Sequence, residues 1–197
     1  QWLAQYRNKH WVPPRPVHRV ILELCCSSKS LLGRMARPDD GCFVIRITEH
    51  EDLRSKWCQQ LCTFLITHYA AGNIPVLVWA SIPCTGGSQW NQLNKIKSAD
   101  TAAKIQAEVD YMKLIWTQFE KVCNKVISKQ GHICIEWPRY CDYWKHDAVR
   151  ALIHRFQMKH VDFDGCAFGL RSVAKATRRP LNHRLRTIKQ SIKSNAM

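Results

Sequence analysis

Acidic side chains are scarce in this sequence, and long apolar runs are absent. The 197 residues include 15 Asp and Glu against 30 Lys and Arg, which gives a formal net charge of +15. No apolar run approaches the length that crosses a bilayer, so we expect a soluble protein without a membrane partner. Because the positive excess is so large, the sequence predicts a polyanionic partner, and nucleic acid is the expected one.

Glycine is also scarce, and the 8 glycines do not form the Gly-x-Gly-x-x-Gly pattern of dinucleotide-binding folds. Cysteine is plentiful instead. The 10 cysteines lie mostly within apolar segments, as reduced thiols do, and we expect an intracellular, reducing compartment. The pairs Cys58/Cys62 and Cys134/Cys141 lack a second close pair of Cys or His, so we expect no metal site.

Short apolar runs alternate with segments of helical periodicity between residues 17 and 170. This order predicts an α/β fold with a single doubly wound, mostly parallel sheet, between a basic N-terminal arm (1–16) and a basic C-terminal segment (171–197). The expected strands are 18–26, 42–48, 74–81, 132–138 and 160–163. The expected helices are 53–72, 98–129 and one that begins at Asp142 or Asp147.

Cys84 follows the apolar strand 74–81 directly, after Pro83 and before a Gly-Gly pair. In open α/β sheets, ligands bind outside the carboxyl ends of the strands, so a thiol at this position is placed for chemistry. A small buried hydrophobe is the alternative interpretation, because free cysteine is among the most buried residue types.

Glu136 stands near the end of the strand 132–138. We expect its carboxyl group to share a crevice with Cys84, because both residues end strands of the same sheet. The alternative is a salt bridge to a neighbouring arginine such as Arg139.

The first expected strand ends in small hydroxyl and thiol residues, followed by a short helical start. A strand, a tight turn and a helix N-terminus present backbone N–H groups to an anionic or carboxylate-bearing ligand. Because the Gly-x-Gly-x-x-Gly fingerprint is missing, a structural turn is the default interpretation of this segment. Glu49, at the end of the second strand, suits ribose hydroxyls or a helix N-terminus. The candidate cofactor residues are Cys25, Cys26, Ser27, Ser30, Gly33, Glu49, Ser81 and Pro83.

Both ends of the chain are basic. Residues 1–19 interleave Trp2, Tyr6 and Trp11 with Lys and Arg, a pattern that suits either base stacking or packing on the domain. Residues 171–193 contain no acid. A solvated tail is one interpretation of this segment, and phosphate binding is the other. The candidate nucleic-acid-binding residues are Arg171, Lys175, Arg178, Arg179, Arg184 and Arg186.

A thiolate at Cys84 can add to an electron-poor ring carbon such as C6 of a pyrimidine. The ring accepts the addition when a nearby carboxyl group stabilises the charge that builds at N3, and Glu136 suits this role. The addition makes C5 nucleophilic toward a methyl donor. The base has to leave its stack, or be single-stranded, to reach the thiol.

The order of these residues resembles the Rossmann-like S-adenosylmethionine-dependent methyltransferases. Pro83-Cys84 and the later Glu136-Trp137-Pro138 resemble the Pro-Cys and Glu-Asn-Val motifs of the DNA cytosine C5 methyltransferases, in a form similar to methyltransferase-like domains of phages and mobile elements. The resemblance implies Cys84 as nucleophile, Glu136 at the cytosine N3 edge, and S-adenosylmethionine held by the Cys25–Gly33 turn with Glu49. A protein partner is expected to supply target recognition.

Three other functions remain open. Residues 81–84 also lie where amino-group methyltransferases carry an Asp/Asn/Ser-Pro-Pro-aromatic motif, which suggests N4-cytosine or N6-adenine as the target. The turn at residues 25–30 lacks the glycines of the usual cofactor loop, which suits a catalytically silent nucleic-acid-binding protein. A cysteine hydrolase would need a histidine base, for which His132 and His160 are the candidates.

Overall fold

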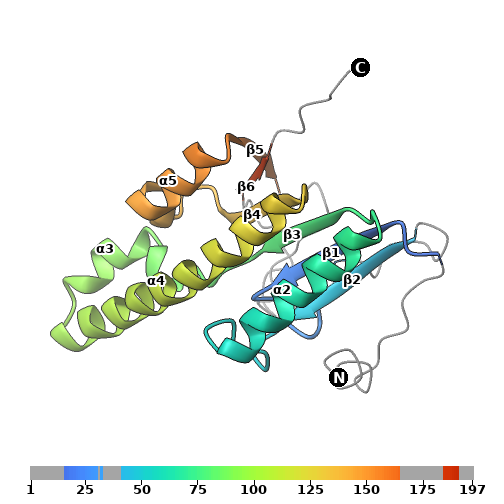
Figure 1. The fold of residues 1–197 in the computed structure, drawn as a ribbon. Helices are drawn as coiled ribbons and strands as arrows, with labels where there is room; N and C mark the ends of the chain where they lie inside the picture. Colours follow the sequence, from blue (N-terminus) through green and yellow to red (C-terminus); the bar gives the residue numbers. More distant parts are fainter. Residues whose placement is uncertain (1–15, 31, 33–40, 165–183, 191–197) are drawn as a thin grey trace. The chain divides into compact units, whose positions relative to one another are not determined.

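The computed structural model describes residues 16–30, 32, 41–164 and 184–190 (Figure 1). The chain forms two compact units. The first comprises residues 1–80 and 115–133, and the second comprises residues 81–114 and 134–197. The long helix α4 (Ala99–Ser128) contributes residues to both. Among the described helices, none combines the length and apolar character that a membrane span needs.

The first unit contains three parallel strands in the order β2-β1-β3: β1 (Arg19–Leu24), β2 (Cys42–Ile47) and β3 (Val76–Ala80). The central strand β1 is buried along most of its length, whereas β2 alternates between buried and half-buried residues. This difference follows from position, because a central parallel strand is covered on both faces. The parallel α/β pattern expected for this part of the chain is confirmed.

Helix α2 (Lys56–Ala71) covers this sheet with one apolar face. Ser55 caps its N-terminus by accepting a hydrogen bond from the Cys58 amide, and Gly72 ends it. The buried residues recur at the spacing of one helix face: Cys58, Leu61, Cys62, Leu65 and Ile66. The thiols of Cys58 and Cys62 are fully buried, so they pack in the core.

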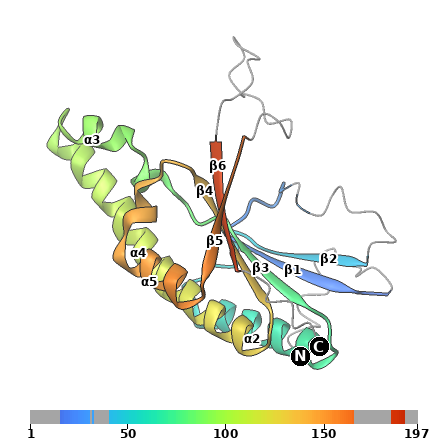
Figure 2. The same cartoon turned by 90° about the horizontal axis from the view of Figure 1, so that it is seen from above.

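The second part of α4 supplies the other helix of this unit, with Phe119, Cys123 and Val126 fully buried. Gly131 follows the helix where the chain passes close to β3, since an added Cβ would lie 2.6 Å from the Val76 carbonyl oxygen. Figure 2 shows α2 and this part of α4 on the same face of β1 and β3. The doubly wound arrangement therefore stays a prediction.

The second unit contains an antiparallel sheet in which β6 (Arg184–Gln190) pairs with both β4 (His132–Pro138) and β5 (Met158–Asp164). The sequence pattern predicted β4 and β5 but indicated an extension for residues 171–197. β6 lies within that segment, and it makes this part of the fold antiparallel.

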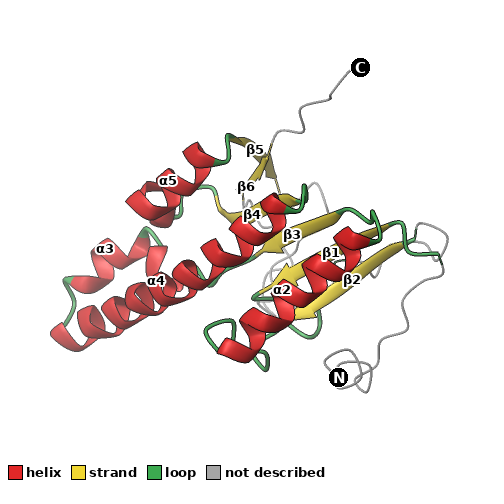
Figure 3. Ribbon diagram, viewed as in Figure 1, coloured by secondary structure: helices red, strands yellow, loops and turns green. Residues whose placement is uncertain are grey.

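Four helical segments complete the second unit besides the first part of α4 (Figure 3). They are η2 (Thr85–Gly87), α3 (Trp90–Lys95), η3 (Asp142–Lys145) and α5 (Asp147–Arg155). Trp137 is buried, with Tyr143 and Trp144 of η3 packed edge-on against it at ring-centroid distances of 5.6 and 4.8 Å. Each pair adds about 0.5–1.5 kcal/mol beyond the area that it buries.

Candidate active site

Cys84 lies at the start of the short helix η2, where its carbonyl oxygen accepts a hydrogen bond from the Gly87 amide at 2.9 Å. Its backbone is near φ −110° and ψ 11°, a sparsely populated region in which many active-site residues are found. The side chain is half-buried. The thiol is therefore accessible, and the turn that carries it is hydrogen-bonded.

Gly86 and Gly87 let this turn pack closely on its surroundings. A Cβ on Gly86 would collide with the Tyr143 hydroxyl and lie 2.9 Å from the Val109 amide nitrogen. A Cβ on Gly87 would lie 2.7 Å from Cys141 Sγ. Both positions require glycine, because the turn approaches α4 and η3 too closely to leave room for a side chain. This close packing fixes the position of Cys84.

Glu136 is joined to the segment before Cys84 by two contacts. The Ser81 hydroxyl donates to Glu136 Oε2 at 3.1 Å, and the Trp137 indole N–H donates to the Ile82 carbonyl oxygen at 2.6 Å. Successive residues of a strand point to opposite faces, so Trp137 enters the core while Glu136 is half-buried beside Ser81. The structure thus brings the segment 81–84 and the end of β4 together.

Arg139, the arginine suggested as a salt-bridge partner for Glu136, pairs with a different acid. Its guanidinium lies 3.3 Å from Asp162 Oδ2 on β5. The neighbouring aromatic residue, Tyr140, has its ring 5.4 Å from the same guanidinium. Arg139 is therefore held by β5 and by its own neighbour in sequence.

The environment of Cys84 favours the protonated thiol. Burial raises its pKa above the ordinary value of 9.0, and the negative charge of Glu136 raises it further, whereas a backbone hydrogen bond lowers it. The hydrogen bond from Ser81 to Glu136 gives the geometric link between this carboxylate and the segment that carries Cys84. Cys84 is a strong nucleophile only as the thiolate. The thiolate forms more readily when Glu136 is neutral or when a proton acceptor takes the thiol proton.

The candidate cofactor turn follows β1. Cys25 adopts φ 56°, in the left-handed region that favours glycine. Cys26 is buried, and its thiol is near the Glu23 and Ile47 carbonyl oxygens. The Ser27 carbonyl oxygen accepts from the Ser30 amide at 2.9 Å, which closes the turn. Burial raises the pKa of both thiols to about 12, so these cysteines are unreactive.

Glu23 was not predicted as a site residue, yet it anchors this turn from within. It is 4% exposed, accepts a hydrogen bond from the Ser30 hydroxyl at 2.5 Å, and lies 3.5 Å from Arg46 Nε. Arg46 also donates to the Ser30 and Leu32 carbonyl oxygens. The signal was present, because an acid within an apolar strand rarely stays buried without a partner.

The acids after β2 differ in their surroundings. Glu51 accepts hydrogen bonds from the amide and hydroxyl of Thr48, and Asp52 is held by Arg54. Glu49 is exposed, and His50 lies 3.8 Å from it. Glu49 is therefore the acid of this group that is open to a ligand, and its cofactor role stays a prediction.

The other predicted site residues are placed as follows. Pro83 is exposed beside Cys84, and Ser81 contacts Glu136. Arg184 and Arg186 belong to β6, where Arg186 is in register with Trp137. The remaining predicted residues lie outside the described part of the chain: Gly33, Arg171, Lys175, Arg178 and Arg179. No group of three or more His, Cys, Asp or Glu in the described ranges is arranged to hold a metal ion.

Comparison of the chain with models of known protein families, with curated proteins and with solved structures gives no match. The functional argument therefore depends on the residues and their geometry.

Proposed function

We propose that this protein is an S-adenosylmethionine-dependent methyltransferase that acts on nucleic acid, with C5 of cytosine in DNA as the preferred target. One observation carries the proposal. The half-buried thiol of Cys84 follows the segment whose Ser81 hydroxyl donates to the half-buried carboxylate of Glu136 at 3.1 Å, and the charge of this carboxylate contributes to the raised pKa of the thiol. This pair of groups suits addition to a pyrimidine ring.

The proposed reaction begins when Cys84 Sγ forms a bond to C6 of the base. The electron pair of the C5–C6 double bond moves toward N3 through the ring, and Glu136 in its acid form donates a proton to N3. C5 is then nucleophilic and takes the methyl group, which S-adenosylmethionine supplies when bound. The C5 proton then leaves to solvent, N3 returns its proton to Glu136, and the C6–S bond breaks to release the product. The sulfur regains from solvent the proton that the thiol lost to solvent on attack, which restores the thiol.

The raised pKa of Cys84 is consistent with coupled titration of the two groups. When Glu136 is ionised, its charge opposes formation of the thiolate. When Glu136 carries the proton that it shares with the base, this opposition is removed and the thiolate forms more readily. Base binding and nucleophile activation are therefore linked through one carboxyl group.

The turn after β1 offers a donor set that fits the carboxylate of the cofactor. In the described part of the chain, the amide N–H groups of Ser27 and Ser28 donate to no acceptor. Consecutive free amides in a tight turn form an anion-binding concavity. Glu49, exposed at the end of the neighbouring parallel strand, fits the ribose hydroxyls.

The charge of the chain supports a nucleic acid substrate. A net charge of +15 favours association with phosphates, and the target base has to be unstacked to reach a half-buried thiol. Among the predicted phosphate-binding residues, Arg184 and Arg186 belong to β6.

A catalytically silent nucleic-acid-binding protein is the second candidate. The observation that favours it is the internal use of the turn after β1: Ser30 is engaged by Glu23, and Cys26 is buried. This alternative predicts that Cys84→Ala leaves the function intact. It also predicts that replacing Arg178, Arg179, Arg184 and Arg186 by Gln lowers the slope of log affinity against log salt, by about one for each phosphate that is no longer neutralised.

Transfer of labelled methyl from S-adenosylmethionine to DNA and to RNA separates these functions. Nucleoside analysis of the product distinguishes 5-methylcytosine from N4-methylcytosine and N6-methyladenine. Our proposal predicts label in 5-methylcytosine that is lost in both Cys84→Ala and Glu136→Gln. Label in an amino group would favour the other methyltransferase class. Salt-sensitive binding without any transfer would favour the silent protein.

A further inference from the structure

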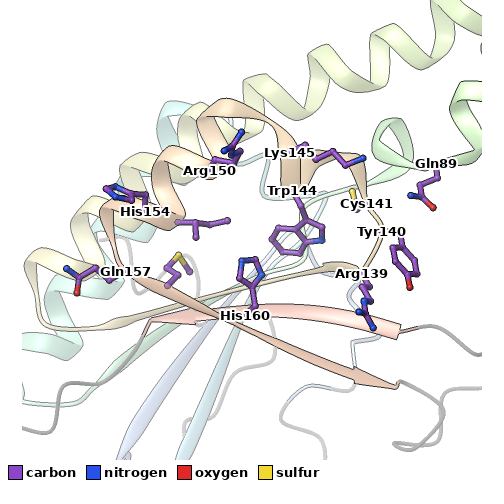
Figure 4. Close-up of a pocket in the computed structure, with 12 residues that line it drawn as sticks. Gln89, Arg139, Tyr140, Cys141, Trp144, Lys145, Arg150, His154, Gln157 and His160 are labelled. Atoms are coloured by element: carbon purple, nitrogen blue, oxygen red, sulfur yellow. The ribbon is translucent and has the colours of Figure 1, made fainter.

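A pocket of about 820 Å³ lies wholly within the second unit, between η3, α5 and β5 (Figure 4). Its volume is within the range of roughly 300–1,000 Å³ that small-ligand sites occupy. The pocket is lined by Gln89, Arg139, Tyr140, Cys141, Trp144, Lys145, Arg150, Ile153, His154, Gln157, Met158 and His160.

The charge of this lining has one sign. Arg139, Lys145 and Arg150 are present, and no carboxylate is among the residues that line the pocket. Asp142 pairs with Lys145 at 2.8 Å and Asp162 pairs with Arg139 at 3.3 Å, so these two cations are held in place by acids outside the lining. Arg150 is exposed and has no ion-pair partner among the described residues. The pocket therefore keeps a net positive charge toward an incoming anion.

Aromatic rings form the centre of the pocket. Figure 4 shows Trp144 and His160 pointing toward each other, with Arg139 and Lys145 on one side and His154 on the other. The rings of Trp144 and His160 are edge-on with centroids 6.3 Å apart. The ring of Tyr140 is largely exposed. Exposed aromatic faces beside guanidinium groups accept the flat ring of a nucleobase by stacking.

Cys141 connects this pocket to the proposed active site. Its sulfur lines the pocket, and it lies against Gly87 of the turn that carries Cys84. Burial raises the pKa of Cys141 to about 12, and the charge of a Cys84 thiolate adds to this shift. A ligand in the pocket would therefore lie next to the Cys84 turn within the same unit.

We propose that this pocket binds a nucleoside 5′-phosphate. The phosphate contacts Arg150 and Lys145, and the base stacks on Tyr140 at the aromatic surface. The ligand is either a free nucleotide or one nucleotide of a single strand. Both present the same groups to the pocket, a base and a phosphate. This inference goes beyond methyl transfer, since it requires neither Cys84 nor a cofactor.

Isothermal titration calorimetry of the full chain, without S-adenosylmethionine, tests the proposal. The probes are thymidine 5′-phosphate, thymidine, deoxyribose 5-phosphate and a short oligothymidylate. We expect thymidine 5′-phosphate to bind more tightly than either of its parts. Lys145→Gln and Arg150→Gln each weaken its binding roughly tenfold, the loss expected for a charged hydrogen bond. Tyr140→Leu weakens its binding but leaves deoxyribose 5-phosphate unaffected.

Lys104→Gln is the matched control for Lys145→Gln. Both lysine side chains are about three-quarters exposed and both pair with an aspartate at 2.8 Å, but only Lys145 lines the pocket. Tighter binding of the oligothymidylate than of the mononucleotide identifies a strand as the source, and equal affinity identifies a free nucleotide. Absence of binding by both, or binding that is unchanged in Lys145→Gln and Arg150→Gln, overturns the proposal. On this account Cys84→Ala retains nucleotide binding. The binding result can therefore be interpreted even if the protein transfers no methyl group.

Discussion

The Ser81 hydroxyl donates a hydrogen bond to Glu136 Oε2 at 3.1 Å, although 55 positions separate the two residues in the sequence. This bond fixes the position of the Glu136 carboxyl group near the end of β4. Ser81 is thus a positioning residue for the proposed reaction, and Glu136 is the group that contacts the base.

The first prediction concerns this hydrogen bond. Ser81→Ala should lower kcat for methyl transfer roughly tenfold, because it removes one hydrogen bond to a charged group. The KM for S-adenosylmethionine should stay unchanged, since Ser81 contacts the acid rather than the cofactor on this account. Steady-state kinetics with each substrate varied in turn separates the two parameters.

Ser81→Thr is the control for this prediction, because it keeps the hydroxyl group. It should recover most of the kcat that Ser81→Ala removes. A rise in the cofactor KM with unchanged kcat in Ser81→Ala would instead return Ser81 to the cofactor site that the sequence indicated.

The second prediction concerns the ionisation of Cys84. Burial and the charge of Glu136 both raise its pKa above 9.0, so alkylation of Cys84 by iodoacetamide should be slow at neutral pH, and its rate should still be rising with pH at that value rather than levelling off. Glu136→Gln removes the charge and should shift the alkylation profile to lower pH. Peptide mass spectrometry follows Cys84 separately from the other cysteines.

Glu49→Gln serves as the control for this experiment, because that acid is exposed and is not among the groups that shift the pKa of Cys84. Its alkylation profile should match that of the unmodified chain. An unchanged alkylation profile in Glu136→Gln would contradict an electrostatic effect of Glu136 on Cys84.

The third prediction concerns the glycine turn. Gly86→Ala places a methyl group against the Tyr143 hydroxyl and the Val109 backbone, and should destabilise the protein by about 1–3 kcal/mol. Gly72→Ala is matched to it, because the nearest atom to an added Cβ there is 3.5 Å away. Urea midpoints at constant slope report both changes. An equal midpoint for the two variants would show that the turn adapts without cost.

Much of the fold follows from local patterns in the sequence. The helix predicted over residues 98–129 is α4, because its apolar stripe and flanking glycine are strong local signals. Strands β1 to β5 were also predicted from local patterns in the sequence. Helix α3 was not predicted, since it has no buried residue, and its exposed Trp90 and Leu93 form no buried stripe from which a helical period can be read.

The second unit was harder to predict because its structure depends on distant pairing. Arg184–Gln190 is rich in cations and resembles a solvated tail, yet it pairs with two strands through backbone hydrogen bonds that charge does not reveal. Cys84 and Glu136 were predicted to share a crevice from their places after apolar strands. Tyr143 and Cys141 were missed as supports of the glycine turn, because their contacts arise only when η3 folds against that turn.

Covalent trapping tests the central claim most directly. An oligonucleotide that carries 5-fluorocytosine retains fluorine at C5 after methyl transfer, so no C5 proton can leave and the C6–S bond persists. With S-adenosylmethionine present, our account predicts a denaturation-resistant adduct whose linked peptide contains Cys84, and none with Cys84→Ala. Absence of the adduct, while the chain still binds the oligonucleotide tightly, would contradict a nucleophilic role for Cys84.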